Sequence, residues 1–335
     1  MEEKRPIDRK RDSSGHFDVD DDTDGAIQQT LNVDGKLLVI KDKAIYEVTF
    51  ADHVDPERKN IDIPPVIQKK VLNLGTESEM VSKTYLMALG MFKKEFLAPY
   101  VDLKKAQAVV LELLIELNAL NEELESYLMA EQAATDEYNK RKELKLDYKL
   151  PSVTDLHTRL KTFFQKADHV LQSLMEINAI FFVEQKLNLR AHFDTFHTLL
   201  VDTFGQEDGF SKFIEGALPF LKVTRALRDC FDHRLENVQV QDFTLQLNND
   251  VLTPTIAMEH RKEKLEPMPV SELLKATTEN LLYVAELSIA YLAAKHPRPV
   301  GLMYQVKEIP LEKRMNKHIR YAFWAPIGPD GFFMQ

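Results

Sequence analysis

The chain of 335 residues carries 53 acidic and 43 basic side chains, a formal net charge of −10, and one cysteine. This length suffices for one large domain or two ordinary ones, and the acidic balance argues against a protein that coats nucleic acid, because neutralising phosphates takes clustered lysine and arginine. A single cysteine excludes an internal disulfide and multi-cysteine zinc frameworks, so we expect a reduced, cytoplasmic protein. Its longest apolar runs fall far short of the ~20 residues of a membrane span, so no membrane partner is expected.

Residues 1–25 mix basic and acidic side chains and offer little to bury, so we expect a disordered acidic tail there. The pattern D-x-D-x-D-G at 20–25 copies the first half of an EF-hand calcium loop. Such a loop needs a bidentate glutamate at its twelfth position, where this chain has Leu31. We therefore expect a solvated acidic segment and no metal.

A small β element is expected over residues 26–75. Apolar side chains alternate with polar ones between residues 37 and 50, and the polar stretch 41–43 is typical of a hairpin turn. A loop with several prolines follows. These features predict an antiparallel pair of strands.

A helical body is expected over residues 76–297. Thr76 and Glu79 have the spacing of a capping box, which predicts the start of a first helix that ends near residue 96. A second, long helix is predicted over 102–135. Along it, apolar residues recur at alternating spacings of four and three, namely Ala106, Val110, Leu113, Leu117, Leu120, Leu124 and Tyr127.

The seam on helix 102–135 has two interpretations, the core of a helical bundle or a dimer interface. Further apolar residues widen the face beyond that of a two-stranded coiled coil, which favours the bundle core; they are Leu111, Leu114, Ile115 and Leu128. The same helix is also a candidate surface for a protein partner.

The rest of the chain continues this alternation of helices and short strands. Helices are predicted at about 151–181, 189–204, 208–235 (interrupted at Gly216 and Pro219) and 269–295, with an inserted β-hairpin at 238–258 and a C-terminal β tail at 298–335. The predicted fold is therefore α+β, predominantly a helical bundle, with small β elements at the N-terminus, after the fifth helix and at the C-terminus.

Several enzyme classes lack their essential groups here. No Walker-type or dinucleotide-binding glycine loop, no nucleophile elbow and no H-E-x-x-H zinc motif occurs. His192 and His197 lie five residues apart on a predicted helix and point in different directions, so we expect structural or surface histidines. No cofactor is predicted.

One arrangement in the fifth predicted helix carries possible chemistry, the run Arg228-Asp229-x-x-x-His233. A histidine can move a proton near neutral pH, and an arginine can stabilise charge on a phosphate without a metal. Asp229 lies four residues before His233 on the same helix face and can orient its imidazole. Arg225 and Arg234 flank the run as candidate RNA contacts.

This run resembles the R-(polar)-x-x-x-H signature of the HEPN superfamily, over about residues 152–237. The resemblance implies an all-helical domain and metal-independent endoribonuclease activity or RNA binding, with Arg228 and His233 acting on the scissile phosphate and the 2′-hydroxyl. It also implies a site completed by a second protomer, hence a homodimer. The chain departs from the pattern in having aspartate where asparagine is common, and in the strands that follow the motif.

Helix geometry leaves a non-catalytic alternative open. Five residues turn a helix by about 140° and advance it by ~7.5 Å, so Arg228 and His233 emerge on opposite flanks and one helix does not bring them to one phosphate. In the alternative, Arg228 pairs with Asp232 and His233 with Asp229 on a solvated face. The protein is then a helical scaffold or protein-interaction protein.

A second candidate RNA surface lies at residues 295–320, which hold seven lysines and arginines against two glutamates and precede three aromatic residues. Basic side chains beside aromatic rings bind single-stranded nucleic acid by phosphate contact and stacking. The alternative is an exposed basic turn beside a strand whose aromatics are core. The candidate contacts are Lys313, Arg314, Lys317 and Arg320.

Overall fold

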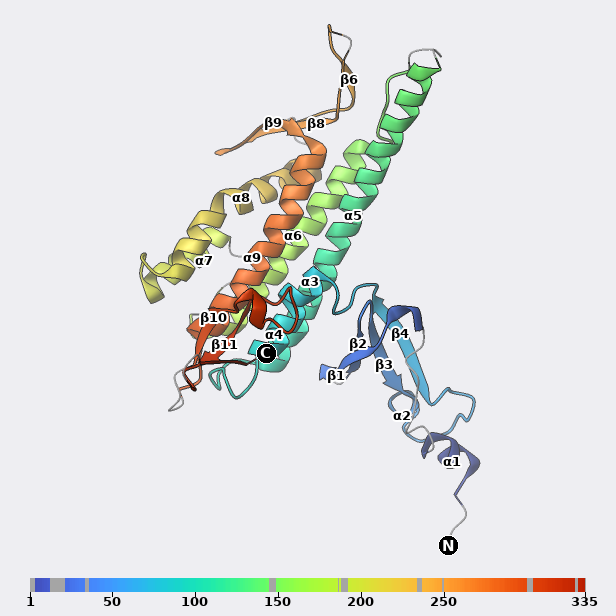
Figure 1. Cartoon of the computed structure of the whole chain (residues 1–335), viewed down its shortest axis with the longest axis vertical. Helices are drawn as coiled ribbons and strands as arrows, with labels where there is room; N and C mark the ends of the chain where they lie inside the picture. Colours follow the sequence, from blue (N-terminus) through green and yellow to red (C-terminus); the bar gives the residue numbers. More distant parts are fainter. Residues whose placement is uncertain are drawn as a thin grey trace. The chain divides into compact units, whose positions relative to one another are not determined.

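The structure is a computed structural model that describes residues 4–12, 22–33, 36–144, 149–185, 187, 192–233, 237–248, 250–299, 304–328 and 331–334. The chain forms two compact units. The sheet unit comprises Met1–Phe96, Asp102–Ala108 and Val300–Gln335, and the helical unit comprises Leu97–Val101 and Val109–Pro299. Helices and small antiparallel sheets occur together, so the prediction of an α+β fold is confirmed (Figure 1).

The sheet unit begins with a four-stranded antiparallel meander in the order β1-β2-β3-β4. Its strands are β1 (Ile27–Val33), β2 (Lys36–Lys41), β3 (Ile45–Phe50) and β4 (Val66–Leu72). The predicted hairpin at 37–50 is confirmed as β2 and β3, whose inward residues form a small core around Val39, Tyr46 and Val48. β4 was not predicted, because the prolines that precede it and its own paired lysines are typical of a loop.

Two short N-terminal helices accompany this sheet, α1 (Pro6–Asp12) and α2 (Ala51–Val54). Residues 6–12 lie in the predicted disordered tail, yet they form α1, because ion pairs with residues 52–60 compensate their charges. Residues 1–3 and 13–21 of the predicted tail lie outside the described residues. Asp24, in the calcium-like pattern, accepts hydrogen bonds from Lys70 and Tyr46 instead.

The first predicted helix is shorter than expected and includes a π-helical turn. It consists of α3 (Glu79–Val81), η2 (Ser82–Leu86) and α4 (Met87–Met91). The predicted capping box is wrong, because Ser78 is the N-cap and Thr76 donates its backbone N–H to the Lys41 carbonyl, 3.0 Å away. Thr76 thus ties the helix start to the β2–β3 turn instead of capping the helix.

The C-terminal residues of the sheet unit form a second antiparallel sheet in the order β10-β11-β12. Its elements are β10 (Gln305–Glu308), η3 (Leu311–Lys313), β11 (Tyr321–Ala325) and β12 (Phe332–Met334). The predicted C-terminal β tail at 298–335 is therefore present. Phe323 of β11 is buried, and its ring centroid lies 4.7 Å from that of Phe96.

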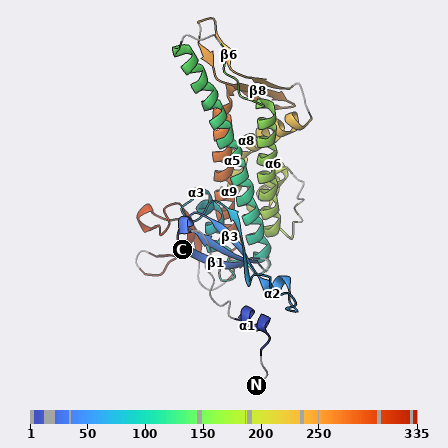
Figure 2. The same cartoon turned by 90° about the vertical axis from the view of Figure 1, so that its right-hand side faces the viewer.

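Long helices make up most of the helical unit (Figures 1 and 2). They are α5 (Leu103–Glu143), whose residues up to 108 belong to the sheet unit, α6 (Leu156–Phe181), α7 (Phe193–Phe204), α8 (Gly209–Asp232) and α9 (Val270–Lys295). α5 and α6 run antiparallel, since Glu116 pairs with His169 while Ser126 accepts a hydrogen bond from Arg159. Among the residues that the structure describes, no helix combines the length and apolar character needed to cross a membrane.

Two features of these helices differ from the sequence prediction. α5 starts as expected, with the Asp102 carboxylate accepting the Lys105 N–H at 3.1 Å, but it continues to Glu143 rather than ending near residue 135. α8 runs unbroken through Gly216 and Pro219, where an interruption was predicted. Proline lacks the donor that a helix interior requires, but buried apolar residues on both sides, among them Ile214 and Leu221, hold α8 against its neighbours.

The seam of α5 is buried within the single chain. Its residues in the helical unit are between 0% and 6% exposed, and they are Val110, Leu113, Leu117, Leu120, Leu124 and Tyr127. Burial by the chain's own helices leaves these side chains inaccessible to a second copy. The structure therefore favours the core interpretation of this seam over a dimer interface.

The inserted β segment between α8 and α9 is larger than the predicted hairpin. Three strands pair in the order β5-β8-β9, and β6 with β7 forms a separate two-stranded ribbon. The strands are β5 (Val238–Gln241), β6 (Thr244–Leu245), β7 (Val251–Leu252), β8 (Thr255–His260) and β9 (Glu263–Pro269). β9 was not predicted, because its charged residues give little apolar alternation.

Aromatic rings enclose His296 directly after α9. Its side chain is 7% exposed and its ring lies 5.4 and 4.9 Å from those of Phe181 and Phe182. The Tyr100 hydroxyl and the imidazole Nδ1 are 2.7 Å apart. Burial among these rings lowers the pKa of His296 to about 4, because the cationic form would lose its hydration.

This burial predicts a specific pH dependence of stability. An unfolded histidine titrates near 6.5, so between that pH and about 4 the unfolded chain holds more protons than the folded one. Above about pH 7 the titration of His296 therefore does not affect the free energy of unfolding. As the pH is lowered to about 4, this titration lowers the free energy of unfolding by roughly 3 kcal/mol. Urea unfolding of the wild type and of His296→Gln at neutral and acidic pH measures it. A variant that loses as much stability on acidification as the wild type would contradict the assignment.

Candidate functional site

Arg228, the first residue of the predicted motif, lies on α8 within an acidic surround. Its guanidinium contacts Asp168 of α6 at 2.7 Å, Asp229 at 2.9 Å and Asp232 at 3.6 Å. Partial burial disfavours its charge, but the hydrogen bonds and charge of Asp168, with those of the two other aspartates, outweigh it and raise the pKa of Arg228. Arg228 is thus a charge held in place by three carboxylates.

Packing between α6 and α8 brings Asp168 to Arg228. The Phe164 and Phe231 rings stack with centroids 5.7 Å apart and planes within 9° of each other. Asp168 lies one helical turn beyond Phe164 and is only 3% exposed. A carboxylate buried to this extent requires charged or hydrogen-bonding partners. The Arg228 guanidinium supplies the charge, and the Gln172 amide donates a further hydrogen bond.

Sequence reasoning did not identify Asp168. A usable signal was present, because Asp168 interrupts an otherwise apolar stripe on helix 156–181 between Ala167 and Val170. An acidic residue on the buried face of a helix predicts a basic partner from another element. Which basic residue pairs with Asp168 depends on which helix packs against α6, and the residue spacing on α6 does not specify that helix.

His233, the last residue of the predicted motif, lies apart from Arg228. It follows α8 as its C-cap, its side chain is exposed, and its backbone N–H donates to the Asp229 carbonyl at 3.0 Å. The Asp229 carboxylate bonds to Arg228 rather than to the imidazole. The non-catalytic interpretation predicts two ion pairs. The pair between Arg228 and Asp232 is present. A pair between Asp229 and His233 is not found among the described residues.

Of the three predicted catalytic residues, the structure brings Arg228 and Asp229 into contact but does not bring His233 to them. Arg228 lines a cleft along α6, α7 and α8, whereas Asp229 and His233 are not among the residues that line it. The expectation that Arg228 and His233 leave α8 on different flanks agrees with this arrangement. Arg234, predicted as an RNA contact, lies outside the described residues.

The cleft, here called the α6–α8 cleft, has a volume of about 620 Å³ and carries a row of three cations on one side. Lys222, Arg225 and Arg228 follow each other at intervals of three residues, which places them in line on α8. We call this row the basic ridge. Its two outer members face carboxylates, Lys222 pairing with Asp194 at 2.6 Å and Arg228 with Asp168.

Arg225, at the centre of the basic ridge, differs from both neighbours. Within the part of the chain that the structure describes, its half-buried side chain has no hydrogen bond or ion pair. The hydrogen bond to Asp194 raises the pKa of Lys222, which marks that cation as engaged. Arg225 is therefore the ridge position at which an incoming anion meets an uncompensated guanidinium.

The described residues hold no group of three or more histidine, cysteine, aspartate or glutamate side chains placed to bind a metal ion. His192 precedes α7 and accepts the Thr195 N–H with its backbone carbonyl. Asp194, near both predicted helix histidines in sequence, pairs with Lys222.

The predicted basic surface at 295–320 is partly structural. Arg314 donates to the Ile309 carbonyl at 2.9 Å, and both Arg314 and Arg320 lie within 3.5 Å of the Glu308 carboxylate. Lys313 and Lys317 are exposed. The two arginines thus hold the turn between β10 and β11, and only the two lysines of this set present their side chains outward.

Comparison with known proteins adds nothing to these residues, because no model of a protein family, no curated protein and no solved structure matches the chain. The HEPN resemblance therefore rests on the run from Arg228 to His233 alone.

The ion pair between α6 and α8 predicts unequal effects of two matched substitutions on one helix. Arg228→Gln leaves the buried Asp168 without its cationic partner, although the Gln172 amide still donates to its carboxylate at 2.7 Å. It should destabilise the helical unit by roughly 2–4 kcal/mol, less than for a fully buried pair because Arg228 is 25% exposed. Arg225→Gln removes the same charge and should change stability by less than about 0.5 kcal/mol.

Urea unfolding followed by far-ultraviolet circular dichroism measures the helices, while fluorescence of the single tryptophan, Trp324, reports on the sheet unit separately. Equal losses in the two variants would mean that the pair with Asp168 does not hold α8.

Proposed function

We propose that the helical unit is a HEPN-like domain that binds RNA in the α6–α8 cleft, with Arg225 as its phosphate contact. The observation that supports this is the unequal state of the basic ridge, whose outer cations pair with carboxylates while Arg225 does not in the described structure. A half-buried guanidinium binds two phosphate oxygens through parallel hydrogen bonds. We propose RNA as the ligand because the motif resembles the HEPN signature. We propose Arg225 as the phosphate contact because of its position and its lack of a partner in the described structure.

Binding at one point, rather than along a surface, is consistent with the charge of the chain. Asp168 and Asp194 lie beside the basic ridge and repel further phosphates, and the whole chain carries −10. We therefore expect one strong phosphate contact and an RNA affinity that depends only weakly on salt concentration.

Cleavage is a further step of the same proposal and requires a homodimer. His233 is exposed at the end of α8 and outside the cleft, so a second protomer can approach it. Two α8 ends related by a two-fold axis would place His233 of one copy toward Arg228 of the other. Asp229 then positions the Arg228 guanidinium, to which it is bonded at 2.9 Å, rather than the imidazole.

A non-catalytic scaffold is the second candidate, and one observation favours it. Asp168, Asp229 and Asp232 already surround Arg228, so its positive charge is compensated before any phosphate arrives. α5 offers such a scaffold a surface, because Met129 is 68% exposed and the helix continues to Glu143.

We further propose that the protein is predominantly a helical bundle and that it works in the cytoplasm. The five helices of 12 to 41 residues support the first point. Cys230, the single cysteine, is buried on α8 and has a raised thiol pKa through desolvation, which suits a packing role.

Fluorescence anisotropy with labelled single-stranded RNA tests the binding. Arg225→Gln should weaken binding about tenfold at low salt and reduce the salt slope by about 0.7, the value of one phosphate contact to a single strand. Arg159→Gln is the matched control, because Arg159 lies on α6 outside the cleft and bonds to Thr154 and Ser126. Equal losses in both variants, or no binding by the wild type, would overturn the proposal.

An RNase assay in EDTA decides between cleavage and the scaffold. A ribonuclease should cleave RNA without metal, and His233→Ala should lose at least about a hundredfold in rate. Arg228→Lys should also be inactive while keeping a charge beside Asp168. Mixing these two inactive variants should restore part of the activity if each site takes Arg228 from one protomer and His233 from the other. Cleavage that survives equally in His233→Ala would identify a contaminant.

A further inference from the structure

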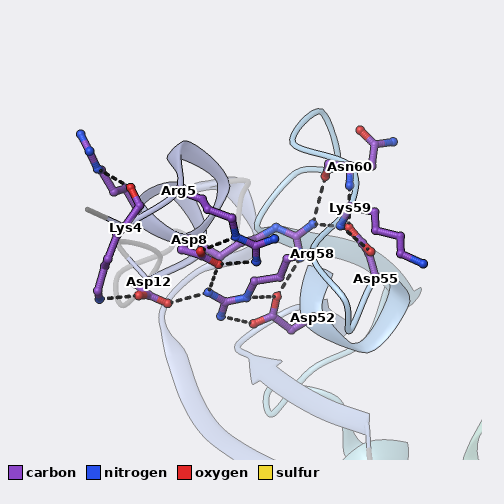
Figure 3. Close-up of polar contacts among 11 residues, drawn as sticks. Lys4, Arg5, Asp8, Asp12, Asp52, Asp55, Arg58, Lys59 and Asn60 are labelled. Carbon is purple, nitrogen blue, oxygen red and sulfur yellow. Dashed lines mark hydrogen bonds and ion pairs between the residues drawn. The ribbon is translucent and has the colours of Figure 1, made fainter. Parts of the chain in front are cut away.

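The N-terminal helix α1 is seated on the turn that follows α2, and charged groups connect them from both sides (Figure 3). Asp8, Arg11 and Asp12 are spaced so that they lie on one face of α1. All three bond to residues 52–60, more than 40 positions away in sequence. This contact lies within the sheet unit.

Arg11 enters a site built for a guanidinium. Its side chain is 2% exposed, and its two terminal nitrogens contact the Asp52 carboxylate at 2.9 Å, the Asp55 carboxylate at 3.3 Å and the Asn60 carbonyl at 3.2 Å. These acceptors surround a planar, multi-donor group, which a lysine ammonium on its flexible stem does not match. The site therefore recognises arginine in particular.

Arg58 supplies the reciprocal contact. Its guanidinium lies 3.2 Å from the Asp8 carboxylate, 2.9 Å from that of Asp12 and 2.6 Å from that of Asp52 (Figure 3). The turn after α2 thus presents one positive and two negative side chains. α1 presents the complementary set of one positive and two negative side chains. We call Asp52, Asp55, Arg58 and the Asn60 carbonyl the arginine socket.

The turn that forms the socket has bonds of its own. The Asp55 carboxylate accepts the backbone N–H groups of Lys59 and Asn60 at 3.0 and 2.9 Å, and the Arg58 N–H donates to the Asp55 carbonyl. The Asp52 carboxylate also bonds Arg58 directly. These bonds do not involve α1, so they can hold the turn when α1 leaves.

The hold of α1 on the socket combines one largely buried ion pair, between Arg11 and Asp55, with others that are partly exposed. α1 has seven residues, too few for a stable isolated helix, and Ile7 is its one buried apolar side chain. Ion pairs that remain partly exposed, as those of Asp12 and Asp52 do, contribute about 1 kcal/mol or less each. Attachment to the same chain keeps α1 at a high local concentration, and this favours its occupancy.

We propose that the arginine socket is a docking site for a short helix of a partner protein that carries the pattern Asp-x-x-Arg-Asp, and that α1 occupies it as the chain's own competing ligand. The arginine of that pattern takes the place of Arg11, and its two aspartates take the places of Asp8 and Asp12 opposite Arg58. Lysine in place of arginine abolishes docking.

Hydrogen exchange on the wild-type chain tests the proposal without any substitution. The probe is a synthetic peptide of residues 4–12, KRPIDRKRD, at millimolar concentration. It should accelerate exchange of the α1 amides by displacing the helix and leave those of β2 and β3 unchanged. The same peptide with lysine at the position of Arg11 should have no effect. Acceleration by both peptides alike would reduce the contact to charge screening and overturn the proposal.

A variant chain gives the second arm. Arg11→Gln should release α1, and fluorescence anisotropy should then show the labelled peptide binding about tenfold more tightly than to the wild type. Arg5→Gln is the matched control, because the exposed Arg5 side chain pairs with Asp8 inside α1, and it should bind like the wild type. Adding Asp52→Asn and Asp55→Asn to Arg11→Gln should abolish binding. Unchanged affinity in Arg11→Gln, with a wild-type circular dichroism spectrum, would rule out the socket.

Discussion

The contact between Arg228 and Asp168 links the two helices on which the candidate site depends. Asp168 is buried because α6 and α8 join their aromatic faces, and a buried carboxylate without a partner costs several kcal/mol. Arg228 removes that cost and thereby fixes the α8 face that lines the cleft. The residue that the motif assigns to chemistry is therefore also a structural partner, and its effect on activity has to be separated from its effect on folding.

Charge compensation follows one rule in both units. Lys222 and Arg228 face aspartates across the α6–α8 cleft, and Arg11 and Arg58 face aspartates across the seat of α1. In an acidic chain, carboxylates are available to pair with most cations that folding partly buries. Arg225 has no such carboxylate in the described structure. That difference, rather than the total number of basic residues, is what makes it a candidate ligand contact.

Much of the fold was predictable because local patterns decided it. The stripe on α6, the Asp102 cap of α5 and the alternation in β2 and β3 require only neighbours in sequence. Elements that depend on distant partners were missed. β4 and β9 have weak alternation and form because an adjacent strand supplies their hydrogen bonds. α1 is helical where the composition predicts disorder, since residues 52–60 compensate its charges.

The candidate site divides in the same way. The sequence by itself determined that Arg225, Arg228 and Asp229 share one helix, with His233 near its end, and that Arg228 and His233 leave it on different flanks, because the rotation per residue is fixed by backbone geometry. Only the tertiary structure decided that Asp168 pairs with Arg228, that Arg225 lies in a cleft and that His233 lies outside it. Those outcomes depend on which helix faces pack together. The burial of apolar surface over the whole unit decides which faces pack together, and the residue spacing within α8 does not specify it.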